Sequence, residues 1–309
     1  MTPSSAERTI RAGLPITRFL NAYLPLSVAR WVIKRSAASV RLPADVTCEV
    51  VSADGVPCEW LIPQNSPKDQ VLLYLHGGGF ILGLTSLHLQ MVAYLARKMG
   101  VRVLVVDYRV APDYPFPAPL DDCVTAYRWL LKQGISAQNI VVAGDSAGGN
   151  LTITTLMKLR DSGEQLPAAA ACLSPVADLT DRDELFKQVS DPLLHPRAAR
   201  VANRSYVAHN DARDPLISPV FGDWRGLPPL LLHAGEDEVL RDDAVRIEDV
   251  AKEAGVDVRL EIYPRMWHVW QLHLTLPQAV QSLDDIAQFL TSHLGSDTAT
   301  PCKLTSATY

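Results

Sequence analysis

The sequence lacks several features that would place the protein in a specialised class. Its 309 residues carry a net charge of −5, so no basic excess indicates a nucleic-acid partner. Its cysteines are few and odd in number, and they show neither CxxC nor Cys/His spacing, which argues against a metal site. They are typical of buried or incidental thiols in a reducing compartment and favour a cytoplasmic location. These cysteines are Cys48, Cys58, Cys123, Cys172 and Cys302.

The N-terminal segment, residues 1–45, lacks a long apolar run. Its longest uncharged stretch, from Phe19 to Ala29, is interrupted by Pro25 and is too short for an integral membrane span. The segment also lacks the order of basic start, apolar core and cleavage site that marks a signal peptide. Seven basic and two acidic residues instead predict an amphipathic helical cap on the protein's own surface. A membrane-surface anchor is the alternative, because basic amphipathic helices bind anionic lipid.

The rest of the chain has the composition and the rhythm of an α/β protein. Hydrophobic residues make up 48% and charged residues 20%, a mix that can bury a large core. From residue 71 onward, short apolar runs alternate with segments of helical spacing, which predicts a mostly parallel sheet of about eight strands flanked by helices. The expected strands are 46–51, 59–62, 71–75, 101–106, 140–143, 168–173, 230–233 and 256–262. The expected helices are 87–99, 120–133, 149–159, 242–254 and 278–294.

The two ends of this pattern differ from its centre. The first two expected strands are joined by a segment with Asp54-Gly55 and Pro57, a turn signal that favours a hairpin and an antiparallel edge. Several central strands are apolar nearly throughout, as expected when helices cover both faces of a sheet.

Two motifs follow directly after apolar runs. Ser146 lies in a GDSAG motif at 144–148, after the expected strand 140–143. A G-x-S-x-G between a strand and a helix places its serine on a sharp turn with Oγ exposed. An HGGG motif at 76–79 follows the strand 71–75, and such a loop supplies backbone N–H groups to the negative oxygen formed on an attacked carbonyl. Together the motifs predict a serine hydrolase that acts on acyl groups.

A serine hydroxyl needs a base to take its proton, and usually an acid behind that base. The chain order in this arrangement is serine, acid, histidine. His268 follows the expected strand 256–262 by a short loop, which is where the base should lie, and we identify it as the base. His273 is the alternative, about one helical turn further on. The other histidines after the serine fall in an insertion, in an apolar run or near the last helix end: His195, His209, His233 and His293.

The acid is expected just after the strand 230–233, where five carboxylates follow one another. Asp242 and Asp243 begin an expected helix, whose dipole favours acids at that end. Spacing alone does not separate Asp237 from Glu238. The full set of candidates is Glu236, Asp237, Glu238, Asp242 and Asp243.

Four motifs in this order resemble those of the hormone-sensitive-lipase-like (family IV) bacterial esterases of the α/β-hydrolase superfamily. They are HGGGF at 76–80, DYRVAP at 107–112, GDSAGG at 144–149 and HVW at 268–270. The resemblance covers roughly residues 45–295. The last motif departs from the family, which more often has Gly-Phe after the histidine.

The resemblance assigns further roles. In that family the acid opens an Asp-Pro-Leu-x-Asp pattern, and the matching stretch 238–242 begins with Glu238, which leaves Asp237 as the alternative. The family pattern assigns the oxyanion hole to Gly78 and Gly79, joined by the N–H of Ala147 after the nucleophile. The resemblance also implies carboxylic esters with short to medium acyl chains as small-molecule substrates, and pairing of two copies through the sheet edge near the last strand. The chemistry needs no metal and no cofactor.

Other residues near these motifs are expected to support the loops. Asp107-Tyr108-Arg109 and Asp145 are predicted to brace the glycine loop, and His76 to tie it down. The aromatic residues Phe80, Trp267 and Trp270 either line the pocket or pack in the core.

Two segments interrupt the alternation, and we expect them to form one cap over the active face. Residues 1–45 are predicted to contain helices broken by Pro15, Pro25 and Pro43. Residues 185–215 show no strand and several proline pairs, and an insertion of this length beside a site is usually a lid. The predicted organisation is a cap segment at 1–45, an α/β-hydrolase catalytic domain at 46–184 and 216–295, a second cap or lid at 185–215, and a flexible tail at 296–309.

Two other functions use the same residues. An amidase or lactonase would keep the nucleophile, base and oxyanion donors and change only the bond that is cleaved. A non-catalytic small-molecule receptor is the third possibility. Receptors with this fold generally lose a triad member, whereas a serine, a histidine and an acid all remain here.

Overall fold

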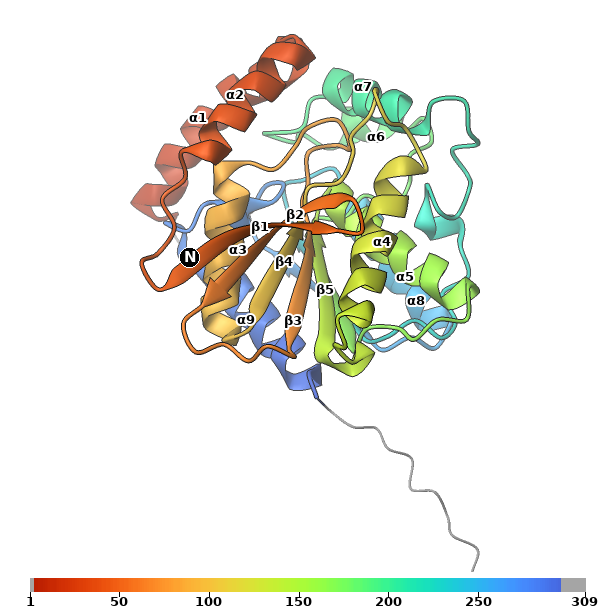
Figure 1. Ribbon diagram of the computed structural model, residues 1–309. Coiled ribbons are helices and arrows are strands. Elements are labelled where there is room, and N and C mark those ends of the chain that lie inside the picture. Colours follow the sequence, from red (N-terminus) through yellow and green to blue (C-terminus); the bar gives the residue numbers. More distant parts are fainter. Residues whose placement is uncertain (1–2, 296–309) are drawn as a thin grey trace, which may run out of the picture.

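Eight strands, all within the residues 3–295 that the computed structural model describes, form one mixed sheet (Figure 1). Their order is β1-β2-β4-β3-β5-β6-β7-β8. β2 pairs antiparallel with β1 and with β4, and every other neighbouring pair is parallel. The strands are β1 Val46–Ala53, β2 Val56–Pro63, β3 Val71–Leu75, β4 Arg102–Val106, β5 Ile140–Asp145, β6 Ala169–Leu173, β7 Leu230–Gly235 and β8 Val258–Tyr263.

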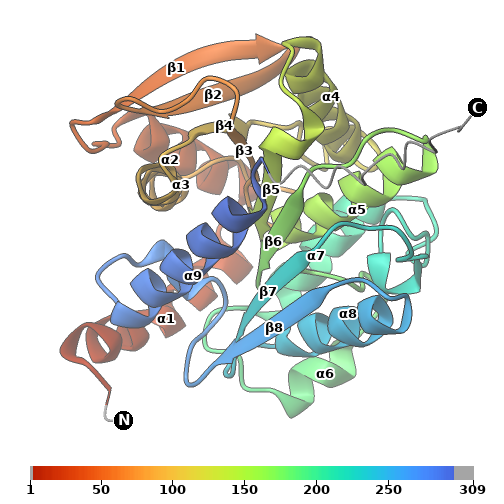
Figure 2. The same cartoon turned by 90° about the horizontal axis from the view of Figure 1, so that it is seen from below.

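Helices cover both faces of the sheet (Figure 2). α3 and α9 lie against one face, and α4, α5 and α8 lie against the other. The helices are α1 Ser5–Tyr23, α2 Leu26–Ala38, α3 Ser86–Met99, α4 Ala118–Lys132, α5 Ala147–Asp161, α6 Asp183–Gln188, α7 Pro196–Val207, α8 Arg241–Glu253 and α9 Pro277–His293. Within residues 3–295, none is both long and apolar enough to cross a bilayer.

The central strands separate two hydrophobic cores. Successive side chains of a strand point to opposite faces. In β3, Leu73 and Leu75 therefore pack with α4 and α5, whereas Leu72 and Tyr74 pack with α3. All five residues of β3 are buried, which explains why this strand shows no alternation of apolar and polar residues.

The sequence predicts this architecture closely. Each expected strand and helix overlaps an observed element, and the α/β-hydrolase fold with an antiparallel edge is confirmed. β5 and β7 extend further than predicted, to Asp145 and Gly235, so both strands run up to the loops that carry the candidate site residues.

The N-terminal helices α1 and α2 form a cap along one rim (Figure 1), and α7 of the predicted lid contacts α1. The predicted break at Pro15 is wrong, because α1 continues through it. The proline removes one backbone hydrogen bond, but neighbouring Leu14 is buried in a cluster with Met266 and Trp267 that holds this turn in place. Pro25, as predicted, separates α1 from α2. The predicted flexible tail at 296–309 and Cys302 lie outside the described residues.

Candidate active site

Ser146 lies on the turn between β5 and α5. Its φ of 54° and ψ of −117° place the backbone in a strained conformation, and Ser146 is 8% exposed. The turn is tight because Gly148 approaches β3 so closely that an added Cβ would lie 1.9 Å from the carbonyl oxygen of Leu75. At Gly144 an added Cβ would lie 2.3 Å from the oxygen of Gly148. The two motif glycines are therefore required by space, and they let the serine project from the end of the sheet.

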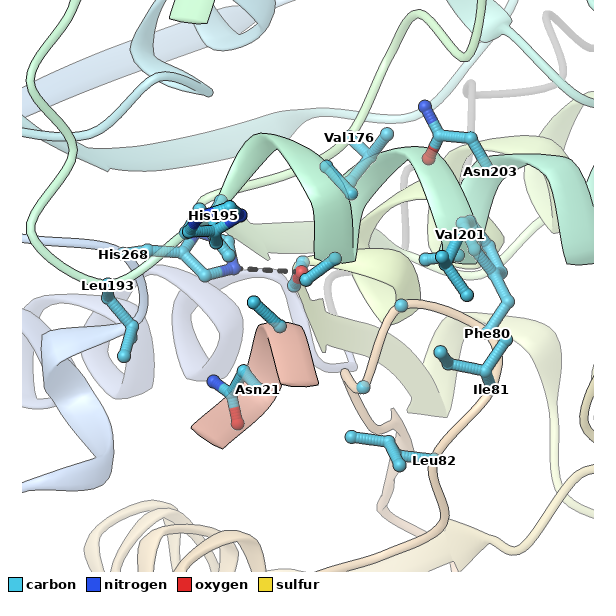
Figure 3. Close-up of a pocket in the computed structure, with 18 of the residues that line it drawn as sticks. Asn21, Phe80, Ile81, Leu82, Val176, Leu193, His195, Val201, Asn203 and His268 are labelled. Atoms are coloured by element: carbon cyan, nitrogen blue, oxygen red, sulfur yellow. Dashed lines mark hydrogen bonds between the residues drawn. The ribbon is translucent and has the colours of Figure 1, made fainter. Parts of the chain in front are cut away.

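His268 connects Ser146 to a buried carboxylate. Its Nε2 lies 2.9 Å from Ser146 Oγ, the contact drawn as the dashed line in Figure 3, and its Nδ1 lies 2.7 Å from Glu238 Oε2. With a proton on Nδ1, the ring donates to Glu238 and can accept the serine proton at Nε2. The loop after β8 carries the histidine, and the loop after β7 carries the acid.

The environment of His268 adjusts its basicity. Burial by itself lowers the pKa of the ring, but the hydrogen bond and the negative charge of Glu238 outweigh burial, and the pKa lies above its ordinary value of 6.5. Asp191 adds a smaller contribution in the same direction. The carboxylates thus favour the cation that forms when the histidine takes a proton.

The structure brings Glu238, and not Asp237, to the histidine. Glu238 is fully buried, and its Oε1 accepts hydrogen bonds from Ser174 Oγ at 2.8 Å and from the N–H of Gly235 at 2.6 Å. The Asp237 side chain is 34% exposed and forms an ion pair with Arg11 at 2.6 Å. Two adjacent carboxylates therefore point in different directions, which spacing alone could not predict.

The alternative histidines lie elsewhere. His273 is half-buried and makes an edge contact with Trp267 rather than with the serine. His233 is fully buried, where it contacts Ser282 and Asp285, as expected for a histidine within an apolar run.

The glycine loop presents free backbone donors beside the serine. The N–H of Gly77 donates to Asp145 Oδ1 at 2.9 Å, and an added Cβ there would lie 2.1 Å from Asp145 Oδ2. Gly78 and Gly79 have φ of 124° and 60°, and their N–H groups donate no hydrogen bond to any described residue. Ala147 is the first residue of α5, so its N–H is one of the donors that a helix start leaves unpaired.

The bracing residues support the loop in two ways. Tyr108 donates from its hydroxyl to the carbonyl of His76 at 2.6 Å and stacks on its ring at 4.3 Å. Burial lowers the pKa of His76 to about 4, so this ring stays neutral. Asp145 accepts from Tyr74 at 2.8 Å in addition to Gly77. Arg109 does not reach the loop: it pairs with Asp122 of α4 at 2.7 Å.

Sequence reasoning missed two residues that position the acid. Ser174 bonds Glu238, and no sequence signal distinguishes it from other serines. Asp191 is 3% exposed, and its Oδ2 accepts the N–H of Val239 at 2.9 Å. Its Oδ1 accepts the N–H groups of residues 193 and 194, which ties the predicted lid to the acid-bearing loop. The Asp-Pro pair at 191–192 is a recognisable turn signal, but it does not indicate the contact with Val239.

A cavity of about 1060 Å³ opens above Ser146 and His268. Figure 3 shows its walls, which come from α1, from the glycine loop and from α7. Phe80 lines the cavity and stacks on Tyr206 of α7 at 3.8 Å, so the cap contacts the glycine loop directly. Trp267 and Trp270 do not line the cavity and pack beneath α1.

Comparisons with known proteins show which family the chain belongs to. Residues 72–272, more than half of the chain, match a family model described as the alpha/beta hydrolase fold. The chain is 40% identical over 250 residues to an acetyl-hydrolase of Streptomyces hygroscopicus, covering 80% of this chain and 83% of that protein. It is 37% identical over 235 residues to an esterase of Acinetobacter venetianus, covering 75% and 78%. The crystal structure of an esterase from the bacterial hormone-sensitive lipase (HSL) family superposes with a TM-score of 0.86 at 38% identity, covering 96% of this chain and 100% of that one.

Proposed function

This chain belongs to the bacterial HSL family of serine carboxylesterases, and we propose that it hydrolyses carboxylic esters with short to medium acyl chains through an acyl-enzyme formed on Ser146. One observation carries the proposal. The hydroxyl of Ser146 lies 2.9 Å from the imidazole of His268, whose other nitrogen lies 2.7 Å from the buried Glu238.

In the first half of the reaction, His268 takes the proton of Ser146 as the hydroxyl oxygen attacks the ester carbonyl. The unpaired N–H groups of Gly78, Gly79 and Ala147 stabilise the negative oxygen of the tetrahedral intermediate. His268 then gives its proton to the departing alcohol, and the acyl group remains on the serine. Glu238 keeps the imidazole in the required tautomer and stabilises its cation.

In the second half, water replaces the alcohol. His268 takes a proton from the water as the water oxygen attacks the acyl-enzyme, and a second tetrahedral intermediate forms in the same oxyanion site. Collapse of this intermediate releases the carboxylic acid and returns the proton to Ser146. All proton transfers therefore pass through one imidazole.

The predicted chain-length range is supported by the cavity. Its volume of about 1060 Å³ exceeds that of most small-molecule sites, and apolar residues of the cap form much of its wall. Leu20 and Leu24 contribute from the α1 end, and Leu193 contributes from the lid. The cavity can therefore hold an acyl chain of moderate length, removed from water, without displacement of the glycine loop.

A substrate series tests this function. We would measure kcat/KM for p-nitrophenyl acetate, butyrate, octanoate and palmitate, and for the anilides of the same acids. We expect turnover of the shorter esters, a fall at palmitate and little turnover of the anilides. Faster cleavage of the anilides would favour an amidase, and binding without any turnover would favour a receptor.

Two further expectations complete the proposal. We propose that two copies pair through β8, which is the outer strand of the sheet at this end and exposes Ile262. Light scattering at several concentrations, with Ile262→Lys as the variant, tests the dimer.

We also propose a cytoplasmic location, supported by the free thiols of Cys48, Cys58, Cys123 and Cys172.

A further inference from the structure

One face of α1 carries large apolar side chains that stay largely exposed, although the ring of Tyr23 also contacts His195 and Arg197 of the lid. Ile16, Phe19, Leu20 and Tyr23 are spaced by three and four residues and so share one side of the helix. Each is about half exposed or more, and Phe19 is 61% exposed. We call these four residues the α1 stripe.

The next helix repeats the pattern. Val28, Trp31 and Val32 form a second group with the same spacing, the α2 stripe, and Trp31 is 61% exposed. The other five tryptophans of the sequence are buried or half-buried. Figure 1 shows α1 and α2 following one another along the same rim of the molecule. Exposed apolar groups that gather in this way usually mark an interaction surface.

Within residues 3–44 the exposed charges have one sign, although Asp113 and Asp237 of other loops pair with Arg30 and Arg11 of this segment. Glu7 is the only acid in residues 3–44, and it is 1% exposed and paired with Arg265. Every exposed charge of this segment is therefore positive. The exposed basic residues are Arg8, Lys34, Arg35 and Arg41.

The α1 stripe continues into the cavity above Ser146. Leu20 and Tyr23 belong to the stripe and also line the cavity, and Leu24 extends the lining by one residue. An apolar path therefore leads from the outer face of the cap to the candidate nucleophile.

We propose that the α1 and α2 stripes dock onto the surface of an anionic lipid bilayer, from which esters enter the cavity; the second part rests on the proposed esterase function. Apolar side chains bordered by Lys and Arg are what such a surface binds. The acidic body of the protein opposes binding little, since charges more than about 8 Å from the lipid headgroups are screened at physiological salt. A second copy is disfavoured as the occupant, because a symmetric contact would bring two positively charged faces together.

Binding is tested on the full chain carrying Ser146→Ala, so that no lipid is consumed. Co-sedimentation would compare vesicles of phosphatidylglycerol and phosphatidylcholine in equal parts with vesicles of phosphatidylcholine alone. We expect binding to the anionic vesicles that weakens with added salt. Brominated lipid should quench Trp31, because the other tryptophans lie deeper in the protein.

Matched variants assign the contact to the stripes. Phe19→Ser with Trp31→Ser should weaken vesicle binding about tenfold or more. Lys34→Gln with Arg35→Gln should weaken binding about thirtyfold. Val50→Ser is the control, since Val50 is 83% exposed on β1, outside the cap, and should bind like the parent.

Three outcomes would overturn the proposal: no binding to anionic vesicles, an equal loss in Val50→Ser, or concentration-dependent self-association that Phe19→Ser abolishes. Assays on the chain with Ser146 intact distinguish failure of this proposal from failure of the esterase function. Phe19→Ser with Trp31→Ser should slow hydrolysis of a vesicle-borne ester and leave a soluble acetate ester unaffected. Loss of esterase activity toward both substrates in the parent chain, with vesicle binding retained, would refute the esterase function alone.

Discussion

Replacing Glu238 with glutamine keeps the size of the side chain and removes the charge that faces His268. The Oε1 of glutamine can still accept from Ser174 and Gly235, which bond Oε1 of the native acid. The amide NH₂ then takes the place of Oε2, 2.7 Å from His268 Nδ1. Since both groups are donors, the ring must adopt the other tautomer, with its proton on Nε2, and it can no longer accept the proton of Ser146.

The expected loss follows from this tautomer change. In the well-studied serine protease triad the equivalent acid-to-amide change lowers kcat by about 10⁴-fold, and we expect a loss of about 10³- to 10⁴-fold for Glu238→Gln. This corresponds to roughly 4 to 5.5 kcal/mol of transition-state stabilisation. Asp237→Asn is the matched control, because Asp237 pairs with Arg11 at the surface. We expect the control to lose less than about threefold.

The assay is the hydrolysis of a soluble p-nitrophenyl ester, with thermal unfolding measured on the same samples. Both variants should remain folded, and only Glu238→Gln should lose kcat. If Asp237→Asn lost activity and Glu238→Gln kept it, the assignment of the acid would be wrong.

Three further predictions follow from the geometry. The pKa of His268 is raised, and the ring must lose its proton before it can act as a base. We therefore expect kcat/KM to rise with pH, and the midpoint of this rise to lie above pH 6.5. A pH–rate profile with a lower midpoint would contradict this. Gly78→Ala should lower kcat about 10²- to 10³-fold. Gly78 has a φ of 124°, and the new Cβ would lie 2.9 Å from the carbonyl oxygen of Leu82, so the N–H of residue 78 would be displaced. Steady-state rates that match the parent would argue against an oxyanion role. Asp191→Asn weakens the hydrogen bond to Val239 and removes a negative charge near His268. We expect kcat to fall about tenfold, the midpoint of the pH–rate profile to move to lower pH, and KM to stay unchanged. An unshifted midpoint would mean that Asp191 has a purely structural role.

Much of the fold could be predicted from the sequence because local patterns determined it. The strand at Val71–Leu75 is apolar throughout since helices cover both of its faces, and its predicted bounds are those observed. The break at Pro15 was predicted wrongly because the tertiary packing of Leu14 outweighs a local preference. Local signals fail where distant residues supply the stabilising contacts.

The candidate site divides in the same way. Ser146 and the glycine loop were recognisable because close backbone approach requires glycine at fixed positions. The resemblance favoured Glu238 over Asp237, but spacing alone did not separate them, since the difference lies in which side chain turns inward beside Gly235. Asp191 was seen only as part of a proline pair, because its contact with the acid-bearing loop joins residues 48 positions apart.

The most direct test of the central claim is to locate the nucleophile. Incubation with a p-nitrophenyl phosphonate, followed by mass spectrometry of the intact chain and its peptides, measures how many adducts form and where. We predict one adduct per chain, on Ser146, formed in proportion to the loss of esterase activity and absent from Ser146→Ala. An adduct on another residue, or full turnover by Ser146→Ala, would contradict the account.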